Sequence, residues 1–265
     1  MGHSLPQHNG AVPTAAPSPS VVARLRAAGC VFAEEEATLL LGAGGDLDGL
    51  VARRVAGEPL EQVLGWAEFC GRRFVVEPGV FVPRRRTGLL VREGAALAVP
   101  DAVVLDLCCG TGAVGAAIAA AVPGIELHAA DVDPAAVRCA RRNVPGAVHE
   151  GDLYAALPAG LRGRVDVLVA NAPYVPTDAI ALMPPEARDH EARAALDGGA
   201  DGLDLQRRVI AGARDWLVPG GVLLIETSEP QAAATQAAFT TAGLRARVVT
   251  DEELDGTVVV GTRTP

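Results

Sequence analysis

Lysine is absent from the 265 residues, and aromatic side chains make up only 3% of them. The 23 basic residues are therefore all arginine, and 32 acidic residues outnumber them, which gives a formal net charge of -9. This balance argues against direct nucleic-acid binding, which favours a basic surface, although a local arginine patch stays open. We draw no function from the missing lysine, because the abundance of Ala, Gly, Arg and Pro is typical of coding bias.

The five cysteines are odd in number and form no Cys-x-x-Cys pair. This pattern favours neither a disulfide framework nor a zinc site, and it fits a reducing cytoplasm best. The start of the chain, MGHSLPQHNGAVPTAAPSPS, lacks the basic and apolar regions of a signal peptide. No apolar run elsewhere reaches the length that crosses a bilayer. We therefore expect a cytoplasmic protein without a membrane segment.

The hydrophobic pattern divides the chain into four regions. Residues 1–17 are rich in Pro, Ser, Ala and Gly without periodicity, which predicts a disordered tail. Residues 18–58 carry apolar side chains at helical spacing between Gly-rich breaks, which predicts a small unit of two or three helices. Residues 59–100 mix aromatic, β-branched and glycine residues, as a connector with a β-hairpin and a helix would. The remaining residues, 101–265, form the predicted main domain.

Within this main domain, short apolar runs alternate with Ala-rich or amphipathic segments. The alternation predicts an α/β fold with a mostly parallel, Rossmann-like sheet that helices cover on both faces. Two β-rich runs at the end, Arg245–Val249 and Thr257–Thr262, have no helix between them, so we expect a C-terminal antiparallel hairpin. The expected parallel strands are Val103–Asp106, Glu126–Ala130, Ala147–Glu150, Val165–Ala170 and Val222–Glu226.

A glycine-rich loop, CCGTGAVG, follows the first of these strands. Gly110, Gly112 and Gly115 match the G-x-G-x-x-G fingerprint of nucleotide cofactors, and Asp131 follows about twenty positions later, where it could accept from ribose hydroxyls. Taken alone, the loop would also fit a nicotinamide dehydrogenase. Asp106 favours an adenosyl sulfonium, because a carboxylate suits a cation but repels a pyrophosphate. The expected C-terminal hairpin, which we associate with S-adenosylmethionine-dependent methyltransferases, points the same way.

Two acidic residues near the loop, Asp152 and Asp131, each have two interpretations. Asp152 could accept from an adenine amino group while Leu153 packs on the ring, or it could be a helix N-cap. Asp131 could instead be a solvated strand end. Cys108 and Cys109 are interpreted as small buried residues of a tight turn.

The strand Val165–Ala170 ends in the tetrapeptide Asn171-Ala172-Pro173-Tyr174. The Asn171 side chain and the Ala172 carbonyl together could hold an –NH2 group attached to a planar carbon, and Tyr174 could lie against its face. An amide nitrogen is a poor nucleophile, so holding its hydrogens would orient its lone pair toward a sulfonium methyl without a strong base. A plain Asn-x-Pro turn is the alternative, but the nearby glycine loop favours the catalytic interpretation.

With these motifs in place, the chain resembles the protein-(glutamine-N5) methyltransferases, which modify release factors and a ribosomal protein. The likeness covers about residues 59–265 and rests on the blocks QVLGWAEFCGRRFVVEPGVFVPRRRTGLLV, VLDLCCGTGAVG, AADVDPAAVRCARRN, VDVLVANAPYVP, EARAALDGGADGLDLQRRVI and GGVLLIETSEPQ. The resemblance implies methyl transfer from S-adenosylmethionine to the side-chain nitrogen of a glutamine exposed on a protein substrate. It also implies that the short N-terminal unit recognises that partner.

The resemblance assigns roles to the candidate residues. Asn171 and Tyr174 would be catalytic, and Asn171, Ala172, Pro173 and Tyr174 would bind the substrate amide. Together with the residues argued above, the predicted cofactor-binding set is Asp106, Cys108, Cys109, Gly110, Thr111, Gly112, Asp131, Asp152, Leu153 and Asn171. No metal site is expected.

Two positions depart from the family pattern. Ala172 replaces the first proline of the usual N-P-P-Y, and Thr87-Gly88 stands where the family has Thr-Glu. Ala172 keeps its carbonyl, and because it precedes Pro173 its backbone should stay extended. The chain therefore resembles a variant subgroup with N-A-P-Y.

Other functions and roles stay open. The first alternative is methylation of N6-adenine or another amino group in nucleic acid, which uses a similar tetrapeptide, although the acidic charge argues against it. The second is a cofactor-binding module with weakened activity. Arg84, Arg85 and Arg86 are expected to form a solvated turn, and Glu191 and Asp197 could brace a substrate loop.

Overall fold

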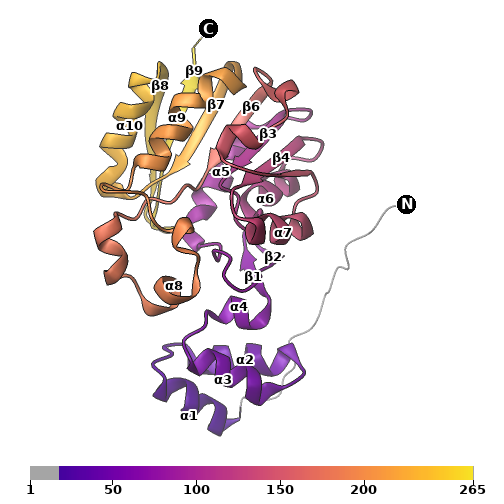
Figure 1. Ribbon diagram of the computed structural model, residues 1–265. Helices are drawn as coiled ribbons and strands as arrows, with labels where there is room; N and C mark the ends of the chain where they lie inside the picture. Colours follow the sequence, from indigo (N-terminus) through magenta and orange to yellow (C-terminus); the bar gives the residue numbers. More distant parts are fainter. Residues whose placement is uncertain (1–17, 265) are drawn as a thin grey trace. The chain divides into compact units, whose positions relative to one another are not determined.

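The computed structural model describes residues 18–264, and the tail predicted over residues 1–17 lies outside them. The described residues form two compact units, which divide between Leu64 and Gly65 (Figure 1). Among the described residues, no helix has both the length and the apolar surface needed to cross a membrane.

The first unit contains four helices in its described part: α1 (Pro19–Ala27), α2 (Ala33–Ala43), α3 (Leu47–Val55) and α4 (Leu60–Leu64). Leu25, Leu40 and Val51 come from three of these helices and are fully buried in a common apolar cluster. Asp46 caps α3, because its side chain accepts a hydrogen bond from Gly49 N at 3.0 Å. The apolar faces of the helices thus form the core of this unit, and the Asp46 cap fixes the start of α3.

The second unit begins with a hairpin and a helix that precede the main sheet. Strand β1 (Trp66–Phe69) pairs antiparallel with β2 (Arg72–Val75). A short 3-10 helix, η1 (Arg85–Thr87), leads directly into α5 (Gly88–Leu97). The hairpin and the helix both lie within residues 59–100.

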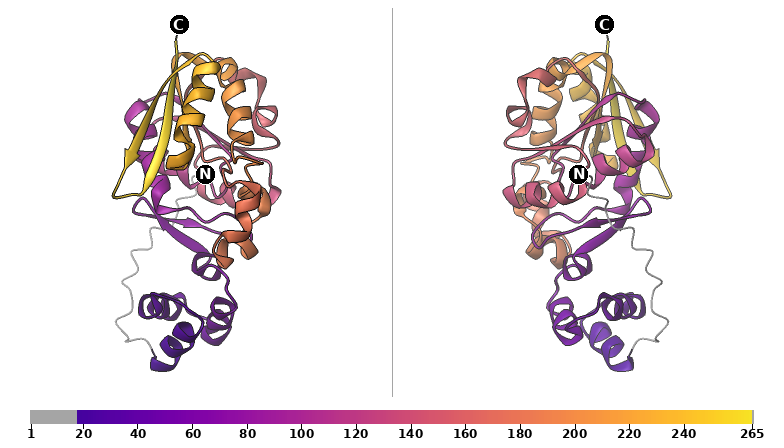
Figure 2. Two further views of the ribbon diagram at one scale, coloured as in Figure 1. Left: turned by 90° about the vertical axis from the view of Figure 1, so that its left-hand side faces the viewer. Right: turned by 90° about the vertical axis from the view of Figure 1, so that its right-hand side faces the viewer.

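The main sheet has seven strands in the order β5-β4-β3-β6-β7-β9-β8. The first five are parallel, and β9 pairs antiparallel with both β7 and β8, so the predicted Rossmann-like fold with a C-terminal hairpin is confirmed. Figure 2 shows this hairpin at one edge of the sheet. The strands are β3 (Val103–Leu107), β4 (Glu126–Asp131), β5 (Ala147–Glu150), β6 (Val165–Ala170), β7 (Leu217–Glu226), β8 (Leu244–Asp251) and β9 (Gly256–Arg263).

Helices cover both faces of this sheet and bury two separate apolar cores. Along β3, Val104 belongs to the core beneath α5 and α6 (Ala113–Ala121), whereas Leu105 belongs to the core beneath α9 (Asp204–Trp216) and α10 (Ala232–Thr241). Successive strand side chains point to opposite faces, so a continuous apolar run serves both cores. Helix α7 (Pro134–Asn143) follows β4, and α8 (Pro185–His190) lies in the long connection between β6 and α9 (Figure 1).

The carboxyl ends of the parallel strands meet at one edge of the sheet. Strand β3 lies between β4 and β6, so the strand order reverses there, and ligands of open α/β sheets bind at such a point. In the register of β6 with β7, Ala170 lies opposite Ile225. Asn171 and Glu226 are therefore neighbours at this edge.

Candidate active site

A pocket at this edge contains nearly all the predicted site residues. Its lining includes Asp106, Cys108, Cys109, Gly110, Thr111, Asp131, Asp152, Leu153, Asn171, Ala172, Pro173 and Tyr174. Gly112 does not line the pocket. A Cβ on Gly112 would fall 2.3 Å from Val144 Cγ2, so this glycine allows the loop to pack against the end of α7.

The glycine loop takes a strained path that Asp131 holds in place. Cys108, Gly110 and Gly112 all have positive φ, at 56°, 54° and 74°, and only glycine adopts that conformation without strain. Asp131 Oδ2 accepts from Gly110 N, and its Oδ1 accepts from Asp133 N, each at 2.9 Å. Asp131 is therefore an anchor of the loop at the pocket wall, and the alternative of a solvated strand end does not describe it.

Asp106 is buried beneath the loop. Its Oδ2 accepts from Gly115 N at 2.8 Å, and a Cβ on Gly115 would lie 3.1 Å from the same oxygen. The third glycine of the fingerprint thus permits a close approach of helix to strand. Burial raises the pKa of Asp106 to about 7; the hydrogen bond from Gly115 N opposes the rise, and the negative charge of Asp131 adds to it.

Asp152 lies at the mouth of the pocket. Its Oδ2 is 2.6 Å from Arg208 Nη2, and both side chains are about half exposed. Although it precedes the 3-10 helix η2 (Leu153–Ala156), its side chain makes no capping hydrogen bond. The helix-cap interpretation is therefore wrong. Leu153, with φ at 47°, is buried against the pocket.

The tetrapeptide end of the pocket is built on buried polar contacts. Asn171 Nδ2 donates to Thr87 Oγ1 at 3.3 Å, and Thr87 is almost fully buried. Tyr174 O–H donates to Glu226 Oε1 at 3.2 Å. Burial raises the pKa of the Tyr174 hydroxyl, and the adjacent charge of Glu226 raises it further, so the group stays protonated.

Glu226 is a site residue that the sequence did not reveal. It ends β7, is only 1% exposed, and lies 3.5 Å from Arg86 Nε through its Oε1. Its Oε2 has no hydrogen-bond partner within the described part of the chain. Burial raises the pKa of Glu226, whereas Thr87, Arg86 and Tyr174 oppose the rise. Its one sequence signal is its place at the end of a predicted strand beside Asn171.

The arginine triplet is not the solvated turn expected from its sequence. Arg84 Nη2 lies 2.7 and 2.8 Å from the two carboxylate oxygens of Glu191, whose side chain is completely buried. Arg86 pairs with Glu226 and lies 6.0 Å from the centre of the Tyr174 ring. Both arginines line the pocket, although Arg86, like Arg85, remains exposed. Each of these two arginines thus forms an ion pair with a glutamate that is distant in the sequence.

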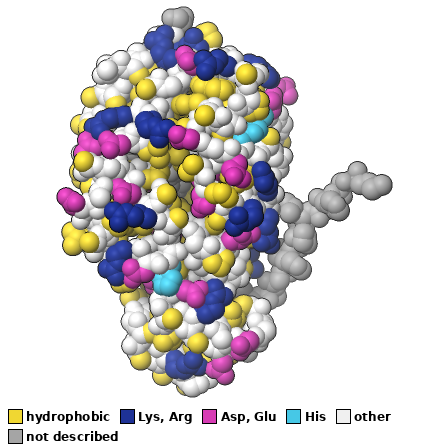
Figure 3. Space-filling view, in the orientation of Figure 1, with side chains coloured by type: hydrophobic (Ala, Val, Ile, Leu, Met, Phe, Trp, Pro, Cys, Tyr) yellow, Lys and Arg dark blue, Asp and Glu magenta, His cyan; other side chains and the backbone are white. Residues whose placement is uncertain are grey.

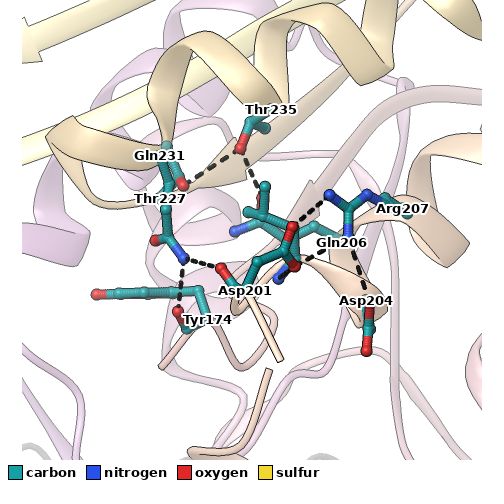
Figure 4. Close-up of polar contacts among 9 residues, drawn as sticks. Tyr174, Asp201, Asp204, Gln206, Arg207, Thr227, Gln231 and Thr235 are labelled. Atoms are coloured by element: carbon teal, nitrogen blue, oxygen red, sulfur yellow. Dashed lines mark hydrogen bonds and ion pairs between the residues drawn. The ribbon is translucent and has the colours of Figure 1, made fainter. Parts of the chain in front are cut away.

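Side-chain amides of Gln206 and Gln231 form hydrogen bonds close to the tetrapeptide (Figure 4). Gln231 Nε2 donates to the carbonyls of Tyr174, at 2.9 Å, and Asp201, at 3.0 Å. Gln206 Nε2 donates to the carbonyl of Glu226 at 3.2 Å, while its Oε1 accepts from Thr235 at 2.9 Å. The network fixes the backbone on which the tyrosine and the glutamate stand.

The charges of the pocket suit a cationic nucleoside. Its lining carries the carboxylates Asp106, Asp131, Asp133 and Asp152, and its two basic residues, Arg84 and Arg86, are each paired with a glutamate. Carboxylates can accept from ribose hydroxyls and attract a sulfonium, but they would repel a pyrophosphate. On the face seen in Figure 3, arginine and acidic side chains are interspersed.

Comparisons with known proteins identify methyltransferase relatives of the chain. Residues 71–200 match the family model described as methyltransferase small domain. The release factor glutamine methyltransferase of Geobacter sulfurreducens is 41% identical over 74% of this chain and 69% of its own length. A 4-amino-L-phenylalanine/4-methylamino-L-phenylalanine methyltransferase of Streptomyces pristinaespiralis is 36% identical over 73% of this chain and 69% of its own.

Solved structures share the fold. A methyltransferase from Pyrococcus furiosus superposes with a TM-score of 0.56 at 16% identity and covers 81% of this chain and 98% of its own. The sequence relatives identify the cofactor as S-adenosylmethionine. The chain belongs to the release factor glutamine methyltransferase family of S-adenosylmethionine-dependent methyltransferases.

Proposed function

We propose that the protein transfers a methyl group from S-adenosylmethionine to the side-chain nitrogen (N5) of a glutamine, and that a release factor is its substrate. The observation that carries the proposal is the placement of Asn171 in one pocket with Asp106 and Asp131. The residue proposed to bind the acceptor and the residues proposed to bind the cofactor therefore line one pocket. The relative from Geobacter sulfurreducens, whose name describes this activity, supports the choice of acceptor.

The chemistry of the tetrapeptide fits an amide nitrogen. Asn171 Nδ2 is engaged by Thr87, so Asn171 Oδ1 is the atom left to accept from the substrate –NH2 group, with the Ala172 carbonyl as second acceptor. The bound cofactor supplies an electrophilic methyl group on a sulfonium. Two acceptors that hold the hydrogens of the amide expose its nitrogen lone pair, and such positioning can lower a barrier by roughly 7–11 kcal/mol in favourable cases.

The remaining acceptor residues would shape the cavity around the planar amide. The Tyr174 ring is held from its hydroxyl end by Glu226, so it can offer a fixed face to the substrate. Phe81 lines the same pocket and is 5.0 Å from the guanidinium of Arg84. The amide loses one proton after transfer, and the open pocket lets that proton pass to solvent.

We also propose that the chain represents a variant subgroup with N-A-P-Y. Ala172 is completely buried, so a methyl group fills the position that the first proline of N-P-P-Y would take. The carbonyl required for the acceptor remains in place. The substitution should therefore preserve the reaction, and Ala172→Pro is expected to keep wild-type activity.

An aromatic amine is the second candidate acceptor. The relative from Streptomyces pristinaespiralis is described as acting on 4-amino-L-phenylalanine, and it aligns over a share of the chain close to that of the release factor enzyme. Its –NH2 group is also bound to a planar carbon, so Asn171 and Ala172 could hold it in the same way. Nucleic-acid amino groups share this chemistry, but the net charge of -9 argues against that substrate.

The proposal is tested by offering the purified protein labelled S-adenosylmethionine with a purified bacterial release factor, with 4-amino-L-phenylalanine and with total RNA in separate reactions. Label on a glutamine of the release factor, located by mass spectrometry, is the expected result. Asn171→Ala should abolish this transfer while calorimetry still detects cofactor binding. Label confined to the amino acid or to RNA would refute glutamine as the acceptor.

Two further expectations remain proposals. We assign recognition of the protein substrate to the helical unit predicted over residues 18–58. A cytoplasmic location is consistent with a translation factor as partner and with the absence of disulfides among the five cysteines, all in the described range.

A further inference from the structure

Residues 191–197, which follow α8, form a segment that we call the strap. Four of its side chains line the pocket, namely Ala192, Ala194, Ala195 and Leu196. Three of the four are alanine, so the strap borders the cavity without filling it. The space left for an acceptor therefore depends on where the strap backbone is held.

The first end of the strap is fixed to the segment that leads into η1. Glu191 Oε1 accepts from Val82 N at 3.0 Å and from Arg84 at 2.7 Å, and its Oε2 accepts from Arg84 at 2.8 Å. The Glu191 side chain is completely buried. Next to it, Ala192 N donates to the Gly79 carbonyl at 3.2 Å. A buried carboxylate that meets a guanidinium at both oxygens gives a strong and directional contact.

The second end is fixed directly behind the tetrapeptide. Asp197 Oδ1 accepts from Thr177 Oγ1 at 2.7 Å. The backbones also pair, because Val175 N donates to the Leu196 carbonyl at 3.1 Å and Gly198 N donates to the Val175 carbonyl at 2.8 Å. The strap thus connects the segment before Thr87 with the segment after Tyr174, and those two residues border the acceptor end of the pocket.

We propose that the strap is the wall that selects the acceptor, and that Glu191 is a positioning residue that sets its distance from the tetrapeptide. The proposal rests on the acceptor chemistry proposed above, although the attachment of the strap is independent of it. Glu191 acts through Val82 and Arg84 and needs no contact with the cofactor. Loss of its charge should therefore weaken acceptor binding more than cofactor binding.

Glu191→Gln tests this role with a nearly unchanged shape. The glutamine oxygen can still accept from Val82 N, but its –NH2 group then faces the donors of Arg84. With a purified release factor as acceptor, KM should rise about tenfold, while kcat should change less than about threefold. The Kd of S-adenosylmethionine, measured by calorimetry, should stay within about twofold. Glu229→Gln, at an exposed glutamate, is the control and should change none of these values.

A double variant separates the contact from general destabilisation. In Arg84→Gln with Glu191→Gln, the two amides can hydrogen-bond to each other without a buried charge, so KM should recover part of the loss seen in either single variant. Strictly additive effects would overturn the proposal. An equal rise in cofactor Kd and acceptor KM would also overturn it, because the strap would then serve the cofactor.

Hydrogen exchange of the full chain tests the attachment without any acceptor. In Glu191→Gln, peptides from residues 79–86 and 190–199 should exchange faster, and β3 peptides should exchange as in the wild type. Unchanged exchange in both segments would overturn the strap. If the wild type does not methylate the release factor, the proposed function fails, and this exchange measurement still decides whether Glu191 holds the strap.

Discussion

Asp106→Asn should stabilise the cofactor-free protein far more at pH 8 than at pH 5. The folded protein raises the pKa of Asp106 from 3.8 to about 7, so the native state binds a proton more tightly than the unfolded chain. Stability is therefore lost as pH rises from the unfolded value to the folded one. Asparagine does not titrate, and its oxygen can still accept from Gly115 N.

The magnitude follows from the size of the pKa shift. A rise of about 3 pKa units corresponds to about 4 kcal/mol, at about 1.4 kcal/mol per unit. The charge costs little below pH 4, about 1.5 kcal/mol at pH 5 and nearly the full amount at pH 8. The stability difference between the two proteins should therefore grow by roughly 2–3 kcal/mol between pH 5 and pH 8.

Urea unfolding at four pH values, followed by tryptophan fluorescence, measures this difference. Trp216 is buried in the main domain and reports on its unfolding. Asp178→Asn, at an exposed aspartate, is the matched control and should follow the wild type at every pH. Parallel pH profiles for Asp106→Asn and the wild type would refute the reasoning, because they would place the folded pKa of Asp106 near its unfolded value.

The raised pKa of Asp106 also predicts that a proton is released when the cofactor binds. A sulfonium in the pocket favours the ionised carboxylate, so S-adenosylmethionine should lower the pKa of Asp106. Near pH 6.5 the binding enthalpy of the wild type should then vary with the ionisation enthalpy of the buffer. Asp106→Asn should lose that variation, and its persistence would assign the proton to another group.

Two further predictions concern packing and burial. Gly112→Ala should lower the free energy of unfolding by about 2–4 kcal/mol, because a left-handed φ is combined with a Cβ placed 2.3 Å from Val144. Gly110→Ala has open space around its Cβ, so it should lower the free energy of unfolding by only about 1–2 kcal/mol. Equal losses in chemical denaturation would contradict the clash. Arg54→Met should destabilise the first unit by about 3–5 kcal/mol, because it strands the buried Glu36, whose Oε2 lies 2.6 Å from Arg54 Nε. Adding Glu36→Met should restore most of this loss in thermal melts, and no recovery would show that the pair is not coupled.

The strands of the main sheet were predictable because each apolar run ends at a polar group. The runs that start at Val103 and Val165 end at the sheet edge where Asp106 and Asn171 stand, and the structure places both residues in the pocket. Strand β7 begins earlier than predicted, at Leu217. Its first half contains Pro219, Gly220 and Gly221, and these residue types are uncommon inside a strand. Here the pairing is irregular, with a shift of register opposite Val165 and Val167.

The partners of the arginine triplet were not predictable, and the reason is physical. Glu191 is 107 residues away from Arg84, and no local spacing rule connects them. A run of three arginines has the composition of a solvated turn, and only the fold decides which side chains turn inward. Arg84 is partly buried against Glu191, whereas Arg86 pairs with the buried Glu226 from the pocket surface, with its side chain still 45% exposed.

The pairing of these two arginines also explains how basic residues can line a candidate active site that binds a cation. An unpaired arginine beside the pocket would repel the sulfonium of the cofactor, whereas a paired one contributes little net charge at that distance. Glu191 and Glu226 thus leave the aspartates of the pocket as its dominant charges. A variant that removes either glutamate while keeping its arginine should therefore weaken the electrostatic attraction of the pocket for the cofactor, and the loss should shrink at high salt. For Glu191, which lies toward the acceptor end, this loss stays within the twofold limit given above.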